Sequence, residues 1–298
     1  MRIVGALGLT ACVLVATVAP VSAQTTSLDG VIDFHVHAGP DSRPRSVSDL
    51  EIARIAKRAG MRGLVLKNHF TMTADRAWIA MQEVPGLEIF GGVALNHAVG
   101  GLNAEAVRQM VAFSGGRGKV VWLPTFDAEF WMTRAGDPGA FISVARDGRL
   151  VPELGAIFDL IAEHDLVLAL GHSSPEEVLL MIPEAKRRGV GRIVVTHGLG
   201  QGPTDAQVAE MVAQGAVVEL VWMSAMNDAA TLDSYVAAIR RHGAAGFLLS
   251  SDLGQAGNPL HTDGLVAFMA ALGRAGISDA DIDTMIRANP ARLLGLDP

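Results

Sequence analysis

The chain has 298 residues and a mass of 31.2 kDa, with half of its residues hydrophobic and 18% charged, so it can bury a sizeable core and is not disordered. Its 31 acidic residues outnumber the 24 basic ones and give a formal charge of −7, which leaves no basic surface for phosphate backbones and disfavours nucleic-acid binding. The 33 glycines against 13 prolines favour a compact fold with many tight turns.

The first 23 residues have the three parts of a secretory signal peptide. Arg2 precedes an apolar run over 3–18, and a small-residue cleavage site follows that run. We therefore expect an exported protein, periplasmic or secreted, whose mature chain 24–298 keeps no stable membrane anchor. An uncleaved anchor and lipidation at Cys12 are the alternatives. Since Cys12 is the only cysteine, the processed chain has no thiolate for a metal, a disulfide or nucleophilic attack.

From Gly30 onward one unit repeats along the chain: a short apolar run, a polar cluster, and then an amphipathic stretch. We predict eight strands, at 31–37, 63–69, 89–95, 119–126, 166–172, 192–197, 216–222 and 246–252. Their almost continuous apolar runs are typical of strands covered on both faces. The pattern predicts an α/β fold, a single (β/α)8 TIM barrel. An open doubly wound sheet is the alternative, but no GxGxxG motif follows the first strand to support nucleotide binding.

Helix starts and one irregular connection refine this prediction. Capping-box spacing marks three helix starts, at Ser48 with Glu51, Ser174 with Glu177, and Thr204 with Gln207. The connection after the fourth strand is long and reaches a helix that begins near Pro152. Within it, Asp147-Gly148 between two alternating runs predicts a hairpin. A long insertion after strand 4 of a barrel lies on the face that carries active sites, so we expect a lid or specificity loop there.

Polar residues gather at the predicted carboxyl ends of the strands, where barrel enzymes have their active sites. They are His35 and His37 on the first strand, Lys67 and His69 on the second, His172 on the fifth, His197 on the sixth and Asp252 on the eighth. Because side chains two apart on a strand share a face, His35 and His37 point together into the barrel mouth, about 6 to 7 Å apart. Imidazoles and a carboxylate that converge from several strands predict a metal site.

This pattern resembles the amidohydrolase superfamily of metal-dependent hydrolases over the whole mature chain. The likeness rests on the His-x-His of the first strand, on the three later strand-end residues, and on the closing segment NPARLLG at 289–295. The resemblance implies one or two divalent ions, Zn²⁺ first and Mn²⁺ or Fe²⁺ as alternatives, with ligands drawn from His35, His37, His172, His197, Asp252 and Lys67. It also implies that metal-activated water attacks a C–N or C–O bond of a small amide, lactone or ester. Asp252 would be the general base, and His197 would stabilise the oxyanion.

The sequence departs from the family pattern at the fourth strand. Binuclear members carry a carboxylated lysine or a glutamate at the end of that strand, whereas Lys119 stands at its beginning. We favour a single metal ion, with His197 beside the water and the ligands His35, His37, His172 and Asp252. The alternatives for Lys67 are a carbamate that bridges two metals and an ammonium that binds a substrate carboxylate.

Four residues are predicted to bind a small-molecule substrate: His69, Arg45, Asp127 and Trp222. Arg43 and Arg45 follow the first strand and could clamp an anionic group. Trp222, Trp131 and Phe126 could form an apolar wall, although Trp222 and Phe126 are equally suited to core packing. Competing functions are a mononuclear decarboxylase or hydratase, a phosphoesterase and a periplasmic binding protein. The sequence leaves a homo-oligomer open.

Overall fold

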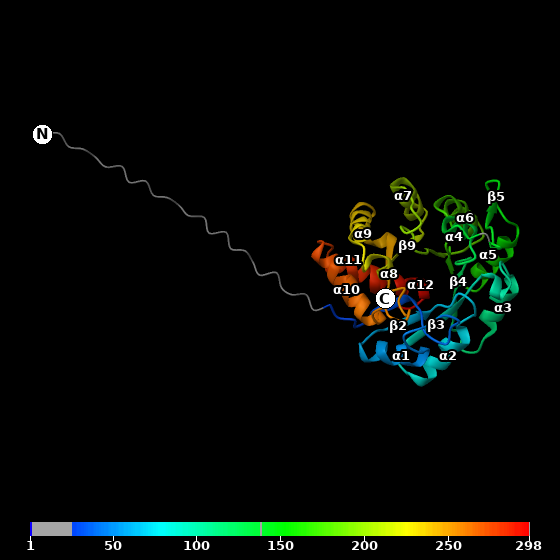
Figure 1. Cartoon of the computed structure of the whole chain (residues 1–298), viewed down its shortest axis with the longest axis horizontal. Coiled ribbons are helices and arrows are strands. Elements are labelled where there is room, and N and C mark those ends of the chain that lie inside the picture. The colour runs from blue at the N-terminus through cyan, green and yellow to red at the C-terminus, as the bar shows by residue number, and fades with distance from the viewer. Residues whose placement is uncertain (2–25, 138, 298) are drawn as a thin grey trace.

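The structure, a computed structural model, describes residues 1, 26–137 and 139–297. The predicted signal peptide, 1–23, lies outside the described residues except for Met1. No helix among the described residues is long and apolar enough to cross a membrane. Figure 1 shows the described chain as strands surrounded by helices.

Eight parallel strands form one sheet, in the order of their succession along the chain. They are β1 (Ile32–Val36), β2 (Gly63–Leu66), β3 (Glu88–Ala94), β4 (Gly118–Trp122), β7 (Val167–Ala169), β8 (Arg192–Val195), β9 (Val217–Val221) and β10 (Phe247–Ser250). The sheet closes between its first and last strands, where the amide of His37 donates to Leu253 and the amide of Asp252 donates to His35, each over 2.8 Å. The (β/α)8 barrel is therefore confirmed, and each predicted strand overlaps an observed one, although β3 and β4 begin one residue before their predicted bounds.

Helices follow the strands and cover the outside of the barrel (Figure 1). The helices are α1 (Asp49–Arg58), α2 (Ala74–Glu83), α3 (Ala104–Ala112), α4 (Glu129–Ala135), α5 (Glu153–Glu163), α6 (Pro175–Arg187), α7 (Asp205–Ala213), α8 (Trp222–Ala225), α9 (Ala229–His242), α10 (His261–Arg274), α11 (Asp279–Asp283) and α12 (Asn289–Leu294), with the short turns η1 (His97–Val99), η2 (Ala244–Gly246) and η3 (Thr284–Ala288). All three predicted capping boxes are present, at the starts of α1, α6 and α7.

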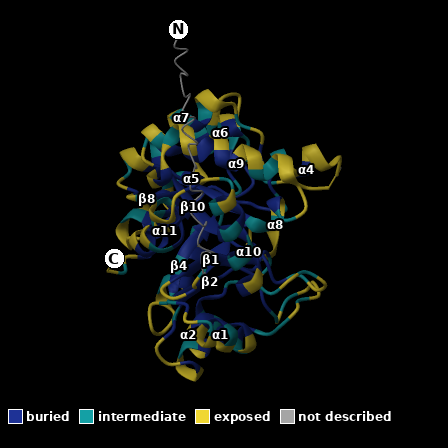
Figure 2. Ribbon diagram, turned by 90° about the vertical axis from the view of Figure 1, so that its left-hand side faces the viewer, coloured by how far each residue is buried: buried dark blue, intermediate teal, exposed yellow. Residues whose placement is uncertain are grey.

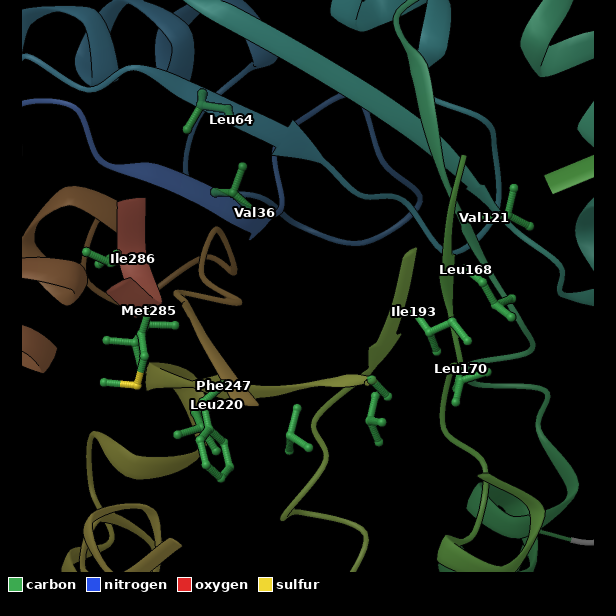
Figure 3. Close-up of a cluster of buried hydrophobic side chains, with 14 of the residues drawn as sticks. Val36, Leu64, Val121, Leu168, Leu170, Ile193, Leu220, Phe247, Met285 and Ile286 are labelled. Carbon is green, nitrogen blue, oxygen red and sulfur yellow. The ribbon is translucent and has the colours of Figure 1, made fainter. Parts of the chain in front are cut away.

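Two apolar layers hold the barrel together. The outer layer lies between strands and helices and includes Val36 and Leu64, as Figure 3 shows. The inner layer fills the barrel and includes Phe34 and Trp122. Burying each such side chain contributes about 1.5–3 kcal/mol. In Figure 2 the strands are buried, and exposed positions lie on the outer faces of the helices.

The C-terminal helix α12 closes the end of the barrel at which the strands begin. Leu293 and Leu294 belong to the inner apolar layer, and Nδ2 of Asn289 donates to the carbonyl of Phe247 over 2.7 Å. Because this end is filled by side chains, polar chemistry is confined to the opposite end, where the strands finish.

The insertion after β4 has structure of its own. It contains α4 and the predicted hairpin, with strands β5 (Ala145–Arg146) and β6 (Arg149–Leu150). Asp147 and Gly148 have φ values of 49° and 70°, the positive values that a type I′ hairpin turn requires at both central positions. The hairpin prediction is therefore confirmed.

Candidate metal centre

The strand-end residues converge on one cavity of about 520 Å³ at the carboxyl end of the barrel. Of the predicted residues, its lining includes His37, His69, His172, His197, Asp252 and Arg45. His35 lies beneath this lining, fully buried, with its ring centroid 5.2 Å from that of His37. The alternation expected along the first strand is present, because Val36 between the two histidines belongs to the outer apolar layer.

His35, His37 and Asp252 form the first candidate group of metal ligands. Nε2 of His35 and Nε2 of His37 lie 3.0 and 3.1 Å from Oδ1 of Asp252. The other nitrogen of His37, Nδ1, donates to the carbonyl of Lys67 over 2.9 Å. In a neutral ring this contact leaves a lone pair on Nε2.

Glu219 fixes the orientation of the His35 ring, as the carbonyl of Lys67 does for His37. Its Oε1 accepts a hydrogen bond from Nδ1 of His35 over 3.1 Å, so that Nε2 of a neutral His35 also carries a lone pair toward Asp252. Two lone pairs and a carboxylate oxygen that face one another repel unless a cation lies between them. The residues present therefore fit a divalent metal ion.

The electrostatics of the metal-free protein agree with this interpretation. Burial and the Lys67 charge lower the pKa of His35, but Asp252 and Glu219 outweigh them and leave this pKa at about 8, so a proton can occupy the place of a cation. Burial raises the pKa of Asp252, but His35 and His197 hold it well below its usual range. Burial lowers the pKa of His37 to about 4. Neutral imidazoles and an ionised carboxylate are the forms that bind metal.

His197 and Asp252 both have unusual backbone conformations. Their φ values are 49° and 53°, in the left-handed region that residues other than glycine seldom adopt. Nε2 of His197 lies 3.5 Å from Oδ2 of Asp252. The backbone amide of His197 donates to Oε2 of Glu219 over 3.2 Å. Burial lowers the pKa of His197 to about 4. Backbone strain held in place by such contacts is typical of functional sites.

His172 stands apart from the first group. Both of its ring nitrogens are buried without a hydrogen-bond partner in the described chain, and burial lowers its pKa well below the usual value. Its ring centroid lies 5.1 Å from that of His197 and 4.7 Å from that of Trp131. The four-ligand set expected for one metal, which includes His172, is therefore not gathered in a single group.

Lys67 lies in the same region and is almost fully buried. Its Nζ has no hydrogen-bond partner among the described residues and lies 5.5 Å from the ring centroid of Trp122. Burial lowers the pKa of Lys67 to about 8, so the amine is more readily deprotonated than an exposed lysine. Lys119 is at the other end of its strand, where Nζ donates to the carbonyl of Asp165 over 2.8 Å.

The four predicted substrate-binding residues divide into two pairs. His69 and Arg45 line the cavity, and Nδ1 of His69 contacts Oγ1 of Thr125 at 2.8 Å. Asp127 is not among the lining residues, and its Oδ2 accepts the amide of His97 over 2.7 Å.

Trp222 is also not among the lining residues. It begins α8 and packs against Phe268, with 5.3 Å between the ring centroids. The indole also lies over Gly264, where a Cβ would be 2.9 Å from it. The missing side chain of Gly264 makes room for the indole in the helix layer. The next two residues of α8, Met223 and Ser224, line the cavity instead.

Sequence reasoning missed Glu219, a single acid within the apolar strand Val217–Val221, and that isolated charge was the signal that could have found it. It also missed Asp33, whose Oδ1 accepts the amides of Ser251 and His35 over 3.0 and 3.3 Å. Burial raises the pKa of Asp33 to about 6. Glu219 further forms a second candidate ligand group with His35 and His197. Because Nδ1 of His35 already donates to Glu219, we interpret Glu219 as a residue that orients ligands.

Solved structures share the fold at low sequence identity. Organophosphorus hydrolase from Deinococcus radiodurans is 16% identical with a TM-score of 0.62, over 90% of this chain and 93% of that one. A probable 2-pyrone-4,6-dicarboxylic acid hydrolase from Acinetobacter baumannii, with citric acid bound, is 12% identical with a TM-score of 0.62, over 90% and 100% of the two chains. A protein from Agrobacterium tumefaciens is 13% identical with a TM-score of 0.59, over 91% and 97%.

The fold expected from the resemblance to the amidohydrolase superfamily is thus confirmed. No curated protein is similar enough to match the chain. A family model does match, over residues 30–219, from before the first strand to Glu219 on β9. The chain belongs to this family, which is described as a family of unknown function, DUF6282.

Proposed function

We propose that the protein is a divalent-metal-dependent hydrolase that cleaves a C–N or C–O bond of a small amide, lactone or ester. The observation that carries this proposal is the approach of Nε2 of both His35 and His37 to one oxygen of Asp252, at 3.0 and 3.1 Å. Imidazole and carboxylate ligands suit Zn²⁺ best, with Mn²⁺ and Fe²⁺ as alternatives. The names of two similar structures, an organophosphorus hydrolase and a probable pyrone-dicarboxylic acid hydrolase, support hydrolysis.

The residues have separate roles in this proposal. His35, His37 and Asp252 would hold a divalent cation, which would lower the pKa of water and polarise the bond to be cleaved. Asp252 is ionised at neutral pH, so it accepts a proton from the attacking water and returns it to the leaving group. His197, neutral and beside Oδ2 of Asp252, donates a hydrogen bond to the oxyanion.

The replacement Asp252→Asn tests the general base. Because Asp252 is also a candidate ligand, the variant is assayed at saturating zinc, where the remaining amide oxygen and the two histidines can still hold the ion and elemental analysis verifies the zinc content. Under these conditions we expect turnover of amides, lactones and esters to fall by about 100-fold or more. Unchanged turnover would eliminate Asp252 as the base.

Three buried side chains with unpartnered nitrogen atoms favour a second cation. His172, His197 and Lys67 all present buried nitrogen atoms without hydrogen-bond partners in the described chain. If the amine of Lys67 reacts with carbon dioxide, the products are a carbamate and one proton, and the carbamate can bridge two metal ions. The metal content of protein produced with and without bicarbonate distinguishes the carbamate-bridged site with two ions from the mononuclear site. Two ions per chain, one of them lost in Lys67→Ala, would establish the bridge. One ion, indifferent to Lys67, would establish the mononuclear site.

A mononuclear site would also suit a decarboxylase or hydratase, since β4 ends at Trp122 without the expected lysine or glutamate. Release of carbon dioxide would distinguish decarboxylation from hydrolysis. We further propose that the enzyme acts after export, on the basis of the signal peptide predicted for residues 1–23. Recovery of a chain that begins at Gln24 from the periplasm or the medium would support export.

A further inference from the structure

The loop between β1 and α1 carries two arginines in unequal environments. Arg45 donates to Oδ2 of Asp41 through both Nε and Nη2, each over 2.7 Å, so an adjacent carboxylate neutralises its charge. The guanidinium of Arg43 has no hydrogen bond or ion pair with any residue that the structure describes, although Arg43 lines the cavity. Arg43 is therefore an exposed cation at the cavity, without an anionic partner among the described residues.

Aromatic rings hold this cation at the cavity wall. Cζ of Arg43 lies 4.3 Å from the ring centroid of Phe126 and 5.8 Å from that of Phe70, within the range of cation–π attraction. Stacking uses only the face of the planar guanidinium. Its N–H donors lie in the plane and remain available for a two-pronged contact with a carboxylate.

The loop is also fixed relative to the metal ligands. Oδ1 of Asp41 accepts the amide of Arg43 over 3.2 Å. The hydroxyl of Ser46 donates to the carbonyl of Gln255, and the amide of Ser46 donates to the carbonyl of Gly254, each over 2.9 Å. Because these acceptors follow Asp252 by two and three residues, the loop that carries Arg43 is bonded to the segment that carries the proposed base. A bound anion would thus need little rearrangement of the loop.

The rest of the cavity suits the remainder of an organic anion. Asp252 is the only acidic residue among its described lining, so little repels a negative charge near Arg43. Phe126, Trp131 and Met223 supply apolar surface. A volume of about 520 Å³ accommodates a small organic molecule.

We propose that Arg43 binds a carboxylate of the substrate, and that the substrate is a small organic anion with an aromatic or apolar body. This inference rests on the proposed function, in which the metal centre acts on another part of the same molecule.

Binding of benzoate and of its neutral analogue benzamide to the zinc-loaded protein, measured by calorimetry, tests the inference. We expect wild type to bind benzoate more tightly than benzamide. In Arg43→Gln the benzoate affinity should fall about tenfold or more, while the benzamide affinity stays unchanged, because only charge-assisted hydrogen bonds are lost. Arg43→Lys should retain part of the benzoate affinity. Arg274→Gln, which removes an equal charge from an exposed position at the end of α10, is the control and should behave as wild type.

Equal benzoate affinities in wild type and Arg43→Gln would overturn the inference, as would wild type that binds neither compound at millimolar concentration. Benzoate binding that requires zinc but is unchanged in Arg43→Gln would assign the carboxylate to the metal, and this result would also overturn the inference. The measurement is independent of turnover. Arg43-dependent binding in a protein that hydrolyses nothing would uphold the substrate class and reject the hydrolase.

Discussion

Glu219 on β9 accepts a hydrogen bond from Nδ1 of His35 on β1 over 3.1 Å, and this contact turns Nε2 of His35 toward Asp252. The same carboxylate accepts the hydroxyl of Ser250 over 2.8 Å and the amide of His197 over 3.2 Å. Glu219 thus connects β1, β10 and the segment that follows β8 beneath the cavity. Burial raises the pKa of Glu219, but the contact with His35 lowers it by more. The resulting pKa of about 2 keeps Glu219 ionised.

Replacement of Glu219 by glutamine should weaken zinc binding without removing a ligand. The amide oxygen can still accept from His35, but the ring loses its ionised partner, and such outer contacts are worth about 10- to 100-fold in metal affinity. Competition with a chelator measures the affinity. Glu163→Gln, at an exposed position at the end of α5, is the matched control. An unchanged zinc affinity in Glu219→Gln would contradict the orienting role.

Zinc should stabilise the folded protein through the first ligand group. A ligand that binds only the folded state at 100 times its Kd adds about 2.7 kcal/mol to the free energy of unfolding. We expect the melting temperature of wild type to rise with zinc and that of His37→Gln to rise far less. His164→Gln, at an exposed histidine, should respond like wild type. An equal zinc response in all three proteins would show that zinc binds elsewhere.

Much of the site could be predicted because a closed barrel brings the ends of all its strands to one face. His37, His172, His197 and Asp252 needed only a correct assignment of strands, which periodicity supplies. Trp222 shows the limit, since strand-end position does not decide whether a side chain enters the cavity or the helix layer. The pairing of Asp41 with Arg45 rather than Arg43 also depends on loop geometry that no periodicity encodes.

His261 gives a prediction about pH. It begins α10, it is 1% exposed, and neither ring nitrogen has a hydrogen-bond partner among the described residues. Burial lowers its pKa from 6.5 to about 4. Between these values the unfolded chain binds a proton that the folded chain does not, so acidification favours unfolding.

Wild type should therefore lose about 2 kcal/mol of stability through this residue between pH 7 and pH 5. Urea unfolding at the two pH values measures the loss. His261→Leu should lose less than wild type by that amount, since the variant has no group to protonate there. The same pH dependence in both proteins would assign the effect to other groups.

Gly254 gives the last prediction, because it lies against the backbone of a metal ligand. A Cβ at this position would lie 1.8 Å from the carbonyl oxygen of His37, and its φ is 128°. Gly254→Ala must displace either the loop or His37. We expect it to cost about 3 kcal/mol in the free energy of unfolding and to weaken zinc binding.

Gly257 in the same loop is the control for Gly254. Its φ is 92°, but a Cβ there meets nothing within 4 Å, so Gly257→Ala should cost only the backbone strain, about 1 kcal/mol, and leave zinc affinity unchanged. Urea unfolding and chelator competition on the two variants separate strain from collision. Equal losses in both would mean that the left-handed backbone, and not the approach to His37, accounts for the glycine at 254.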